Sequence, residues 1–171
     1  ATPFRTDGKL VGGKVIFNYP LSRAQQRGYF KPIQFRSVCE FDPASADRAI
    51  LEAATSALTQ DIEAGCDHIL MARAVSIIRA EEIHRLYQQL AGHYKPVLIH
   101  SELTSTERTE RFSALRRRET RIVVCVDMLG EGFDLPELKI AALHDMHKSL
   151  AITLQFVGRF TRTTEKIGNA T

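Results

Sequence analysis

The sequence predicts an α/β fold, a parallel sheet with helices on both faces, and three observations support this. From about residue 46 onward, stretches with helical spacing alternate with short apolar runs. Continuous apolar strands separated by helices are typical of βαβ units, whose sheets are covered on both faces. With 44% hydrophobic and 25% charged residues, the composition is that of a globular protein. A chain of 171 residues is also long enough to bury a core without disulfides or a metal.

Several stretches have the spacing of an amphipathic helix, and they cover residues 46–65, 76–92, 104–118 and 149–158. The first carries a stripe of Ala, Ile and Leu along one side. Asp42 or Ser45 is expected to cap its start, and Gly65 is expected to end it. In the third stretch, Thr104 followed by Glu107 predicts a capping box.

Short apolar runs between the helices are expected to be strands, at residues 68–72, 96–100, 121–127 and 140–146. In parallel sheets of this kind, functional groups gather just beyond the carboxyl ends of the strands. That rule singles out the segments that follow the strands, at residues 72–76, 100–103, 127–137 and 145–149.

Residues 1–45 have a different pattern from the alternating helices and strands that follow. They contain two short β-like runs and one short helical stretch, and we expect them to be a linker or a small accessory element. The first residues, "ATPFR", lack a methionine, and the last, "TEKIGNAT", do not close an element. We therefore expect the chain to be a piece of a longer protein.

Charge and cysteine usage limit the possible functions. A net charge of +3 and a pI near 8.9 permit a nucleic-acid partner but do not require one. The cysteines Cys39, Cys66 and Cys125 lack CxxC or Cys/His spacing, so a zinc site or a disulfide framework is not expected. There is no signal peptide and no apolar run near 18 residues, so we expect a cytoplasmic protein without a membrane partner.

Two segments contain residue types that bind phosphates or nucleotides. The loop "GEGFDLPE" contains Gly132 and Asp134, which suit a close backbone approach to a ligand and a hydrogen bond to a ribose hydroxyl, but also an ordinary turn. The segment "LQFVGRFTRT" places Arg159 and Arg162 on one face of a helix. Such a pair can stabilise charge on a transferred phosphoryl group, or it can simply complement the dipole at a helix end.

Taken together and in order, these segments resemble the second RecA-like domain of superfamily-two helicases and translocases. In that family, motif VI reads Gln-x-x-Gly-Arg-x-x-Arg, and Gln155, Gly158, Arg159 and Arg162 match every specified position. The segment "VCVDMLGEGFDLP" resembles motif V, "HILMARAVSIIRAEEI" resembles motif IV, and "ATPFR" resembles the tail of motif III. The sequences of "ATPFR" and of the glycine loop resemble those of the DEAH-like and restriction-enzyme translocase branch.

The resemblance implies half of an ATP site. Arg162 is expected to act as the arginine finger, with Arg159 beside it and Gln155 coupling the site. Gly132, Asp134 and Gly158 are expected to lie near the nucleotide. The chain contains no GxxxxGK[ST] loop and no DEAD- or DEAH-like box, so ATP and Mg²⁺ are expected to need the first RecA-like domain of the same polypeptide. The isolated fragment is therefore expected to be inactive as an ATPase.

The resemblance also implies contacts with the phosphates of one strand of DNA, or less readily RNA, from loops at the strand ends. The candidate residues are Arg73, Ser76, His100, Ser101, Asp127 and Met128. The alternatives are a solvated charge for Arg73, a helix N-cap for Ser76 and a packed core histidine for His100.

By the same resemblance, residues 1–5 are the tail of the preceding domain, residues 6–45 a linker, and residues 46–171 the second RecA-like domain, truncated at its C-terminal end. Many family members carry Thr just before the motif V aspartate, and Val126 stands there in this chain, so the corresponding phosphate contact is missing.

One alternative function is that of a RecA-like module that only binds nucleic acid or protein. A free-standing α/β enzyme is not favoured, because no GxSxG and no dinucleotide glycine loop is present.

Overall fold

The computed structural model describes residues 34–40, 42–126 and 135–145. Its centre is a parallel sheet of four strands in the order β2-β3-β1-β4. The strands are β1 (Ile69–Ala74), β2 (Val97–Ile99), β3 (Ile122–Val126) and β4 (Leu138–Leu143). Because all neighbouring pairs are parallel, the carboxyl ends of the strands share one edge of the sheet.

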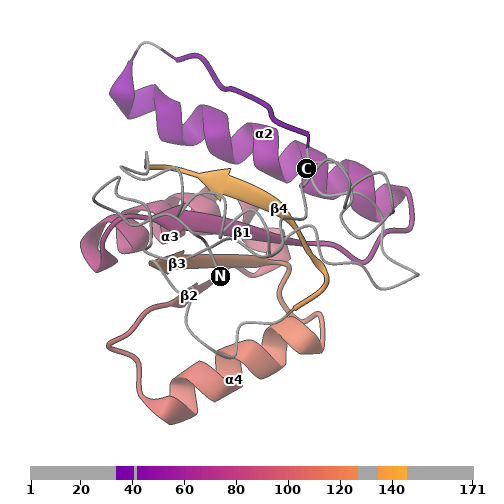
Figure 1. Cartoon of the computed structure of the whole chain (residues 1–171), viewed down its shortest axis with the longest axis vertical. Helices are drawn as coiled ribbons and strands as arrows, with labels where there is room; N and C mark the ends of the chain where they lie inside the picture. The colour runs from indigo at the N-terminus through magenta and orange to yellow at the C-terminus, as the bar shows by residue number, and fades with distance from the viewer. Residues whose placement is uncertain (1–33, 41, 127–134, 146–171) are drawn as a thin grey trace, which may run out of the picture.

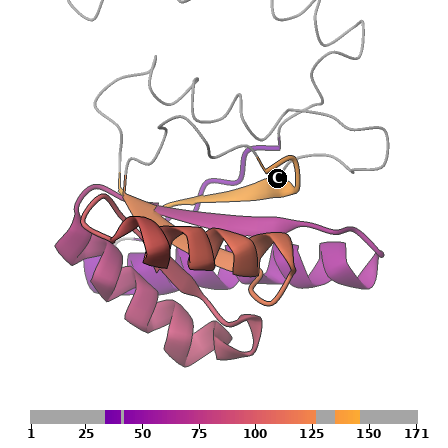
Figure 2. The same cartoon turned by 90° about the horizontal axis from the view of Figure 1, so that it is seen from below.

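Helices cover both faces of this sheet. Figure 1 shows α2 (Pro43–Glu63) beside β4 and α4 (Ser105–Arg116) beside β2. The third helix, α3 (Ile77–Ala91), packs against β1, β2 and β3. Figure 2, which views the molecule from below, places α4 nearest the viewer. The predicted α/β fold is therefore confirmed.

The sheet separates two apolar cores, because alternate residues of a strand point to opposite faces. Leu70, Ala72 and Ala74 of β1 face the core shared with α2 and α3. Ile69 and Met71 face the second core. Every residue of β1 is buried, as expected for a central strand covered on both faces.

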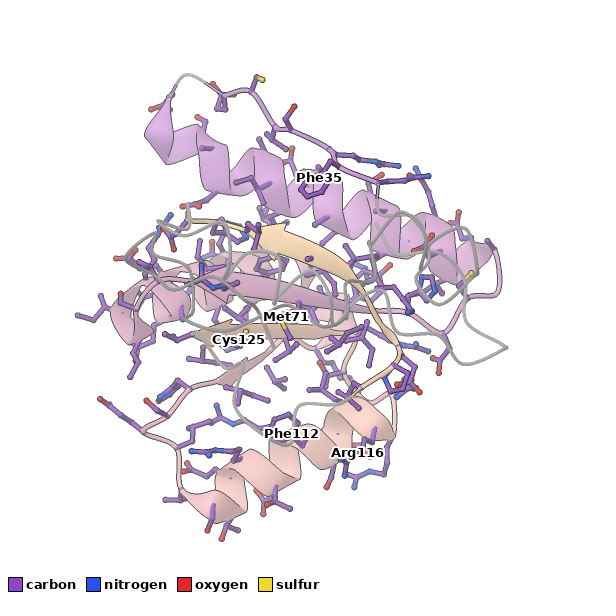
Figure 3. The ribbon with its side chains drawn as sticks, viewed as in Figure 1. Phe35, Met71, Phe112, Arg116 and Cys125 are labelled. Atoms are coloured by element: carbon purple, nitrogen blue, oxygen red, sulfur yellow. The ribbon has the colours of Figure 1, made fainter. Side chains whose placement is uncertain are left out.

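The second core lies between the sheet and α4. Met71 and Cys125 lie on the neighbouring strands β1 and β3, and Leu115 of α4 packs against the same cluster. Phe112, which is partly buried, joins them from α4, and Figure 3 labels Met71, Phe112 and Cys125. Cys125 is a buried thiol, as befits a cysteine in an apolar run.

Local sequence signals explain the ends of α2. The helix begins directly after Asp42, whose carboxylate accepts a 2.7 Å hydrogen bond from the Ser45 hydroxyl. It starts three residues before the sequence-based estimate, with Pro43 as its first residue, where a missing N–H costs nothing. Gly65 follows the last turn with φ of 81°, so it ends the helix as expected.

The start of α4 confirms the predicted capping box. The Thr104 hydroxyl accepts a hydrogen bond from the Glu107 N–H at 3.2 Å, and the Glu107 carboxylate accepts one from the Thr104 N–H at 2.9 Å. Two helical N–H groups that lack partners within the helix are thereby satisfied.

The chain turns differently at the end of α3. Gly92 follows the helix with right-handed torsion angles and opens a short 3₁₀ turn, η1 (Gly92–Tyr94). The left-handed residue here is Lys95, with φ of 51°. A side chain in this region costs roughly 1–2 kcal/mol relative to glycine.

The opposite, amino edge of the sheet is held by charges. Asp67, just before β1, accepts hydrogen bonds from Arg118 at 2.8 Å and pairs with Arg121 of the loop before β3. Arg118 also pairs with Glu137, just before β4, at 2.8 Å. The guanidinium of Arg118 lowers the pKa of Asp67, and that of Arg121 adds to the effect. These ion pairs tie together the entries to three strands, far from the carboxyl edge.

Candidate functional site

The carboxyl edge of the sheet is where the sequence places its candidate residues, and the structure describes four of them. These four are Arg73, Ser76, His100 and Ser101. The remaining candidates, namely Asp127, Met128, Gly132, Asp134, Gln155, Gly158, Arg159 and Arg162, lie outside the described residues. So do residues 1–33, which include the expected tail of the preceding domain, and the expected helix at residues 149–158.

Ser76 lies on the exposed turn between β1 and α3, and it is the N-cap of that helix. Its hydroxyl oxygen accepts a hydrogen bond from the Arg79 N–H at 3.2 Å. The alternative reading of Ser76 as a helix cap is therefore confirmed. The two roles are compatible, because the capping oxygen still carries a hydroxyl hydrogen that can be donated to a phosphate, and helix N-termini attract anions.

Two apolar side chains flank Ser76 at the surface. Val75 is 56% exposed and Ile78 is 72% exposed. Ser76 is exposed as well, so this turn lies at the surface of the described part of the chain.

Arg73 is the opposite case. It is 2% exposed and pairs in register with Cys125 of β3 on one side and Leu143 of β4 on the other. Its position in the alternation of β1 puts it on the face of Ile69 and Met71. The reading of Arg73 as a solvated surface charge is therefore wrong.

His100 and Ser101 follow β2 in a loop that α4 holds in place. Arg108 donates a 3.2 Å hydrogen bond to the Ser101 carbonyl, and Arg111 donates one to the Leu98 carbonyl. Ser101 is exposed, whereas His100 is partly buried and its Nδ1 is shielded from solvent. Because β3 separates β1 from β2, the turns of Ser76 and Ser101 lie roughly 10 Å apart, twice the spacing between neighbouring strands.

Asp145, the second residue after β4, contacts the turn of Ser76. Its Oδ2 accepts a 2.9 Å hydrogen bond from the Val75 N–H, and its Oδ1 lies 3.5 Å from Nε of Arg79. The Val75–Ser76 turn is thus fixed by a side chain 70 residues away in the sequence.

Arg79 is surrounded by carboxylates. It pairs with Asp47 of α2, with Glu82 of its own helix at 3.2 Å and with Asp145 at 3.5 Å. Burial disfavours its charge, but the hydrogen bonds from Arg79 to Asp47 and Glu82 outweigh that effect, so the pKa of Arg79 is raised. The arginine is therefore a permanent cation at this position.

Behind this ion-pair cluster lies a buried polar chain. His144 Nδ1 is 3.0 Å from Oδ1 of Asp47, and His144 Nε2 is 3.3 Å from the Tyr87 hydroxyl. Burial lowers the pKa of His144, although Asp47 opposes this, and burial raises the pKa of Tyr87. Both rings are therefore neutral near pH 7. Neutral His144 then donates from Nδ1 to Asp47 and accepts the Tyr87 O–H at Nε2.

Reasoning from sequence missed this network. The strand-end rule did point to the segment that begins at Asp145, but not to its partners. Nothing in the sequence spacing of residues 47, 79 and 145 links them.

Metal-binding groups and membrane-spanning helices are the next two features to consider in the described part of the chain. Within these residues, no group of three or more His, Cys, Asp or Glu side chains is arranged to hold a metal ion. None of the helices described is long and apolar enough to cross a membrane.

Comparison with known proteins identifies the family. The model of the helicase conserved C-terminal domain matches residues 52–164, which is most of the chain. The chain belongs to the helicase C-terminal domain family. The match includes the region of Gln155 to Arg162 as well as the described β1, α3, β2, α4, β3 and β4.

Relatives of this helicase domain come from several kinds of protein. UvrABC system protein B of Thermosipho africanus is 40% identical over 73 residues, which are 40% of this chain and 11% of that protein. DEAD-box ATP-dependent RNA helicase 15 of Arabidopsis thaliana is 31% identical over 87 residues, 51% of this chain and 20% of that protein. The helicase domain thus matches only a small part of the length of these relatives.

Solved structures share the fold. A fragment of a putative HsdR subunit of a type I restriction enzyme from Vibrio vulnificus YJ016 matches with a TM-score of 0.69 and 22% identity, over 99% of this chain and 37% of that one. The second domain of the DEAD-box helicase Mss116p, bound to an RNA duplex, matches with a TM-score of 0.56 and 20% identity, over 72% of this chain and 48% of that one. At these identities the matches establish the RecA-like fold.

Proposed function

We propose that this helicase domain is the C-terminal half of an ATP-dependent nucleic-acid helicase or translocase. The observation that carries the proposal is the family match over residues 52–164, a range that contains the whole Gln-x-x-Gly-Arg-x-x-Arg motif. The exposed Ser76 at the carboxyl edge supports it, because it combines a hydroxyl with a helix N-terminus.

In this proposal the chain contributes one wall of the ATP site. Arg162 acts as the arginine finger, Arg159 lies beside it, and Gln155 couples the two domains. Gly132, Asp134 and Gly158 contact the nucleotide. Bound ATP supplies the phosphoryl group that is hydrolysed, with Mg²⁺ held by the first RecA-like domain, which residues 1–5 conclude and residues 6–45 connect to this one. Closure of that domain onto this edge then completes the site.

The nucleic-acid contacts in this proposal are made with backbone phosphates. Ser76 and Ser101 are exposed on two turns of the same edge, and the segment of Asp127 and Met128 follows the strand between them. Contacts of this kind hold a strand without reading its sequence. Arg73 and His100 lie deeper, and in this proposal they support the two turns.

DNA is the nucleic acid that we favour as the binding partner. The sequence of the glycine loop resembles that of the restriction-enzyme translocase branch. The match to the HsdR fragment, which extends over 99% of the chain, supports a place in that branch. RNA is the alternative, since the relatives include an RNA helicase and the second domain of Mss116p was solved on an RNA duplex.

The test is ATP hydrolysis by the full-length protein and by its Arg162→Ala variant. Loss of an arginine finger lowers kcat by roughly 10³–10⁵. A matched control is Arg117→Ala, which removes an exposed arginine whose partner is Glu119 at the end of α4. We expect Arg162→Ala to lose nearly all turnover and Arg117→Ala to keep it. Near-normal turnover by the folded Arg162→Ala protein would remove the finger assignment.

The same protein distinguishes the motor from a binding module. A motor hydrolyses ATP faster when single-stranded DNA or RNA is present, whereas a RecA-like module that only binds nucleic acid does not hydrolyse ATP. For the isolated chain we expect no ATPase and weak binding that falls steeply with salt.

A further inference from the structure

The turn that carries Ser76 is held from two directions. From β4, Oδ2 of Asp145 accepts the Val75 N–H at 2.9 Å. From within α3, the N–H of Arg79 donates to the Ser76 hydroxyl oxygen at 3.2 Å. The side chain of Arg79 returns to Oδ1 of Asp145, 3.5 Å from its Nε. The four residues therefore form a closed ring of contacts around the turn.

The charged side chains of this ring are partly sheltered, whereas its bonds to Val75 and Ser76 lie at the surface. The side chains of Asp145 and Arg79 are 21% and 29% exposed, whereas Val75 is 56% exposed. The contact between Arg79 and Asp145 is part-buried, and a hydrogen bond with partial shelter from water is stronger than one on the open surface. That contact therefore anchors the carboxylate that holds the exposed turn.

The negative charge of Asp145 bears on whether its side chain contacts nucleic acid directly. Asp145, like Asp47 and Glu82, is paired with the cation Arg79. An ionised carboxylate has no hydrogen to donate to a phosphate oxygen. Asp145 is therefore unsuited to touch nucleic acid directly, and it acts on the turn through the Val75 N–H and Arg79.

We propose that Asp145 is a positioning residue for nucleic-acid binding, which holds the Val75–Ser76 turn so that the Ser76 hydroxyl and the start of α3 face a backbone phosphate. The inference rests on the proposed function. A preorganised turn binds more tightly than a mobile one, because no ordering cost is incurred on binding. Asp145 therefore affects affinity for the strand rather than the chemistry of ATP.

The experiment measures nucleic-acid-stimulated ATPase of the full-length protein against increasing oligo(dT), with oligo(rU) in parallel. We expect Asp145→Ala to raise the apparent KM for the oligonucleotide about tenfold, the loss of one charge-assisted hydrogen bond. The rate at saturating oligonucleotide is expected to stay within about twofold of the wild type, because the bound complex still forms.

A matched control removes a different carboxylate from the same cluster. Glu82 pairs with Arg79 at 3.2 Å, and its hydrogen bond within the cluster goes to the side chain of Arg79 rather than to the turn. We expect Glu82→Gln to leave the apparent KM for the oligonucleotide within about twofold of the wild type, since the Val75 N–H keeps its partner.

A double variant shows whether Asp145 acts through Ser76. If it does, Ser76→Ala combined with Asp145→Ala raises the KM no further than the larger single effect. Effects that multiply would overturn the proposed route. Asp145→Asn keeps an oxygen for the Val75 N–H, and we expect it to restore the KM toward the wild-type value.

Several outcomes would overturn the inference. A folded Asp145→Ala protein with a lower thermal midpoint and a KM within twofold of the wild type would show a purely structural role. If Asp145→Ala does not fold, Asp145→Leu takes its place, because leucine fills a similar space without an oxygen for the Val75 N–H. A KM within twofold of the wild type then overturns the inference, and a larger rise supports it. A wild-type protein without nucleic-acid stimulation would instead contradict the proposed function.

Discussion

His144 Nδ1 lies 3.0 Å from Oδ1 of Asp47, so the end of β4 is tied to the first turns of α2. The imidazole is buried, and its other nitrogen meets the Tyr87 hydroxyl of α3 at 3.3 Å. Rings of Tyr87 and His144 meet edge-on, with centroids 5.7 Å apart. One neutral histidine thus joins three elements behind the turn of Ser76.

The buried His144 predicts a pH-dependent stability. Burial lowers the pKa of His144 below its ordinary value near 6.5, with Asp47 opposing the shift. The unfolded chain therefore binds a proton at a pH where the folded chain does not, so stability is lost as the pH falls below about 6.5. We expect the thermal midpoint of the protein to decrease between pH 6.5 and pH 5.

His144→Gln is expected to flatten this decrease, because glutamine does not titrate. The control is His93→Gln, since His93 is exposed in η1. An equal slope of thermal midpoint against pH in the wild type and in His144→Gln would contradict the assignment.

Tyr87→Phe tests the other end of the same chain. The substitution removes only the hydroxyl and leaves Nε2 of His144 buried without its donor. A buried polar atom deprived of its partner costs about 1–3 kcal/mol. We expect the free energy of unfolding, measured by urea denaturation, to fall by that amount. Thr59→Val is a milder comparison, since the Thr59 hydroxyl meets a partly buried Tyr94 hydroxyl. A loss below about 0.5 kcal/mol in Tyr87→Phe would argue against the hydrogen bond.

Lys95 offers a test of backbone strain. It is exposed and has φ of 51° at the end of η1. Lys95→Gly relieves the left-handed conformation but makes the unfolded chain more flexible, and Lys95→Ala does neither. We expect the glycine variant to be more stable than the alanine variant by about 0.5–1 kcal/mol in urea denaturation. The reverse order would show that residue 95 does not keep this conformation in solution.

The capping box is expected to stabilise the first turn of α4. Thr104→Ala removes the oxygen that accepts the Glu107 N–H, at a cost of about 1 kcal/mol. Thr109→Ala is the control, because Thr109 lies mid-helix and bonds only to the Ser105 carbonyl. We expect amide exchange in the first turn of α4 to quicken in Thr104→Ala alone. Equal exchange in both variants would contradict a capping role.

Much of the fold was predictable because its signals are local. The Thr104 and Glu107 capping box, the stop at Gly65 and the four apolar strands each depend on neighbouring residues. Strand ends were displaced by a few residues: β1 extends to Ala74 and β2 ends at Ile99. Such boundaries depend on pairing with other strands, which spacing within one segment does not show.

The candidate site was less predictable, because its contacts join residues that are far apart in the sequence. Ser76 was found because a serine before a helical pattern is a local signal. The sequence predicts Arg73 as a phosphate contact or a solvated charge, but the strand runs past it and buries it between β3 and β4. The bond from Asp145 to Val75 spans 70 residues, and only the strand order, which brings β4 beside β1, creates it.

The most direct test of the central claim is the ATPase rate of the full-length protein with and without single-stranded nucleic acid. We expect hydrolysis to rise at least about tenfold on saturation with oligo(dT), and the apparent affinity to fall steeply between about 50 and 200 mM salt because phosphate contacts release counterions. An ATPase rate that neither DNA nor RNA changes would contradict a nucleic-acid motor.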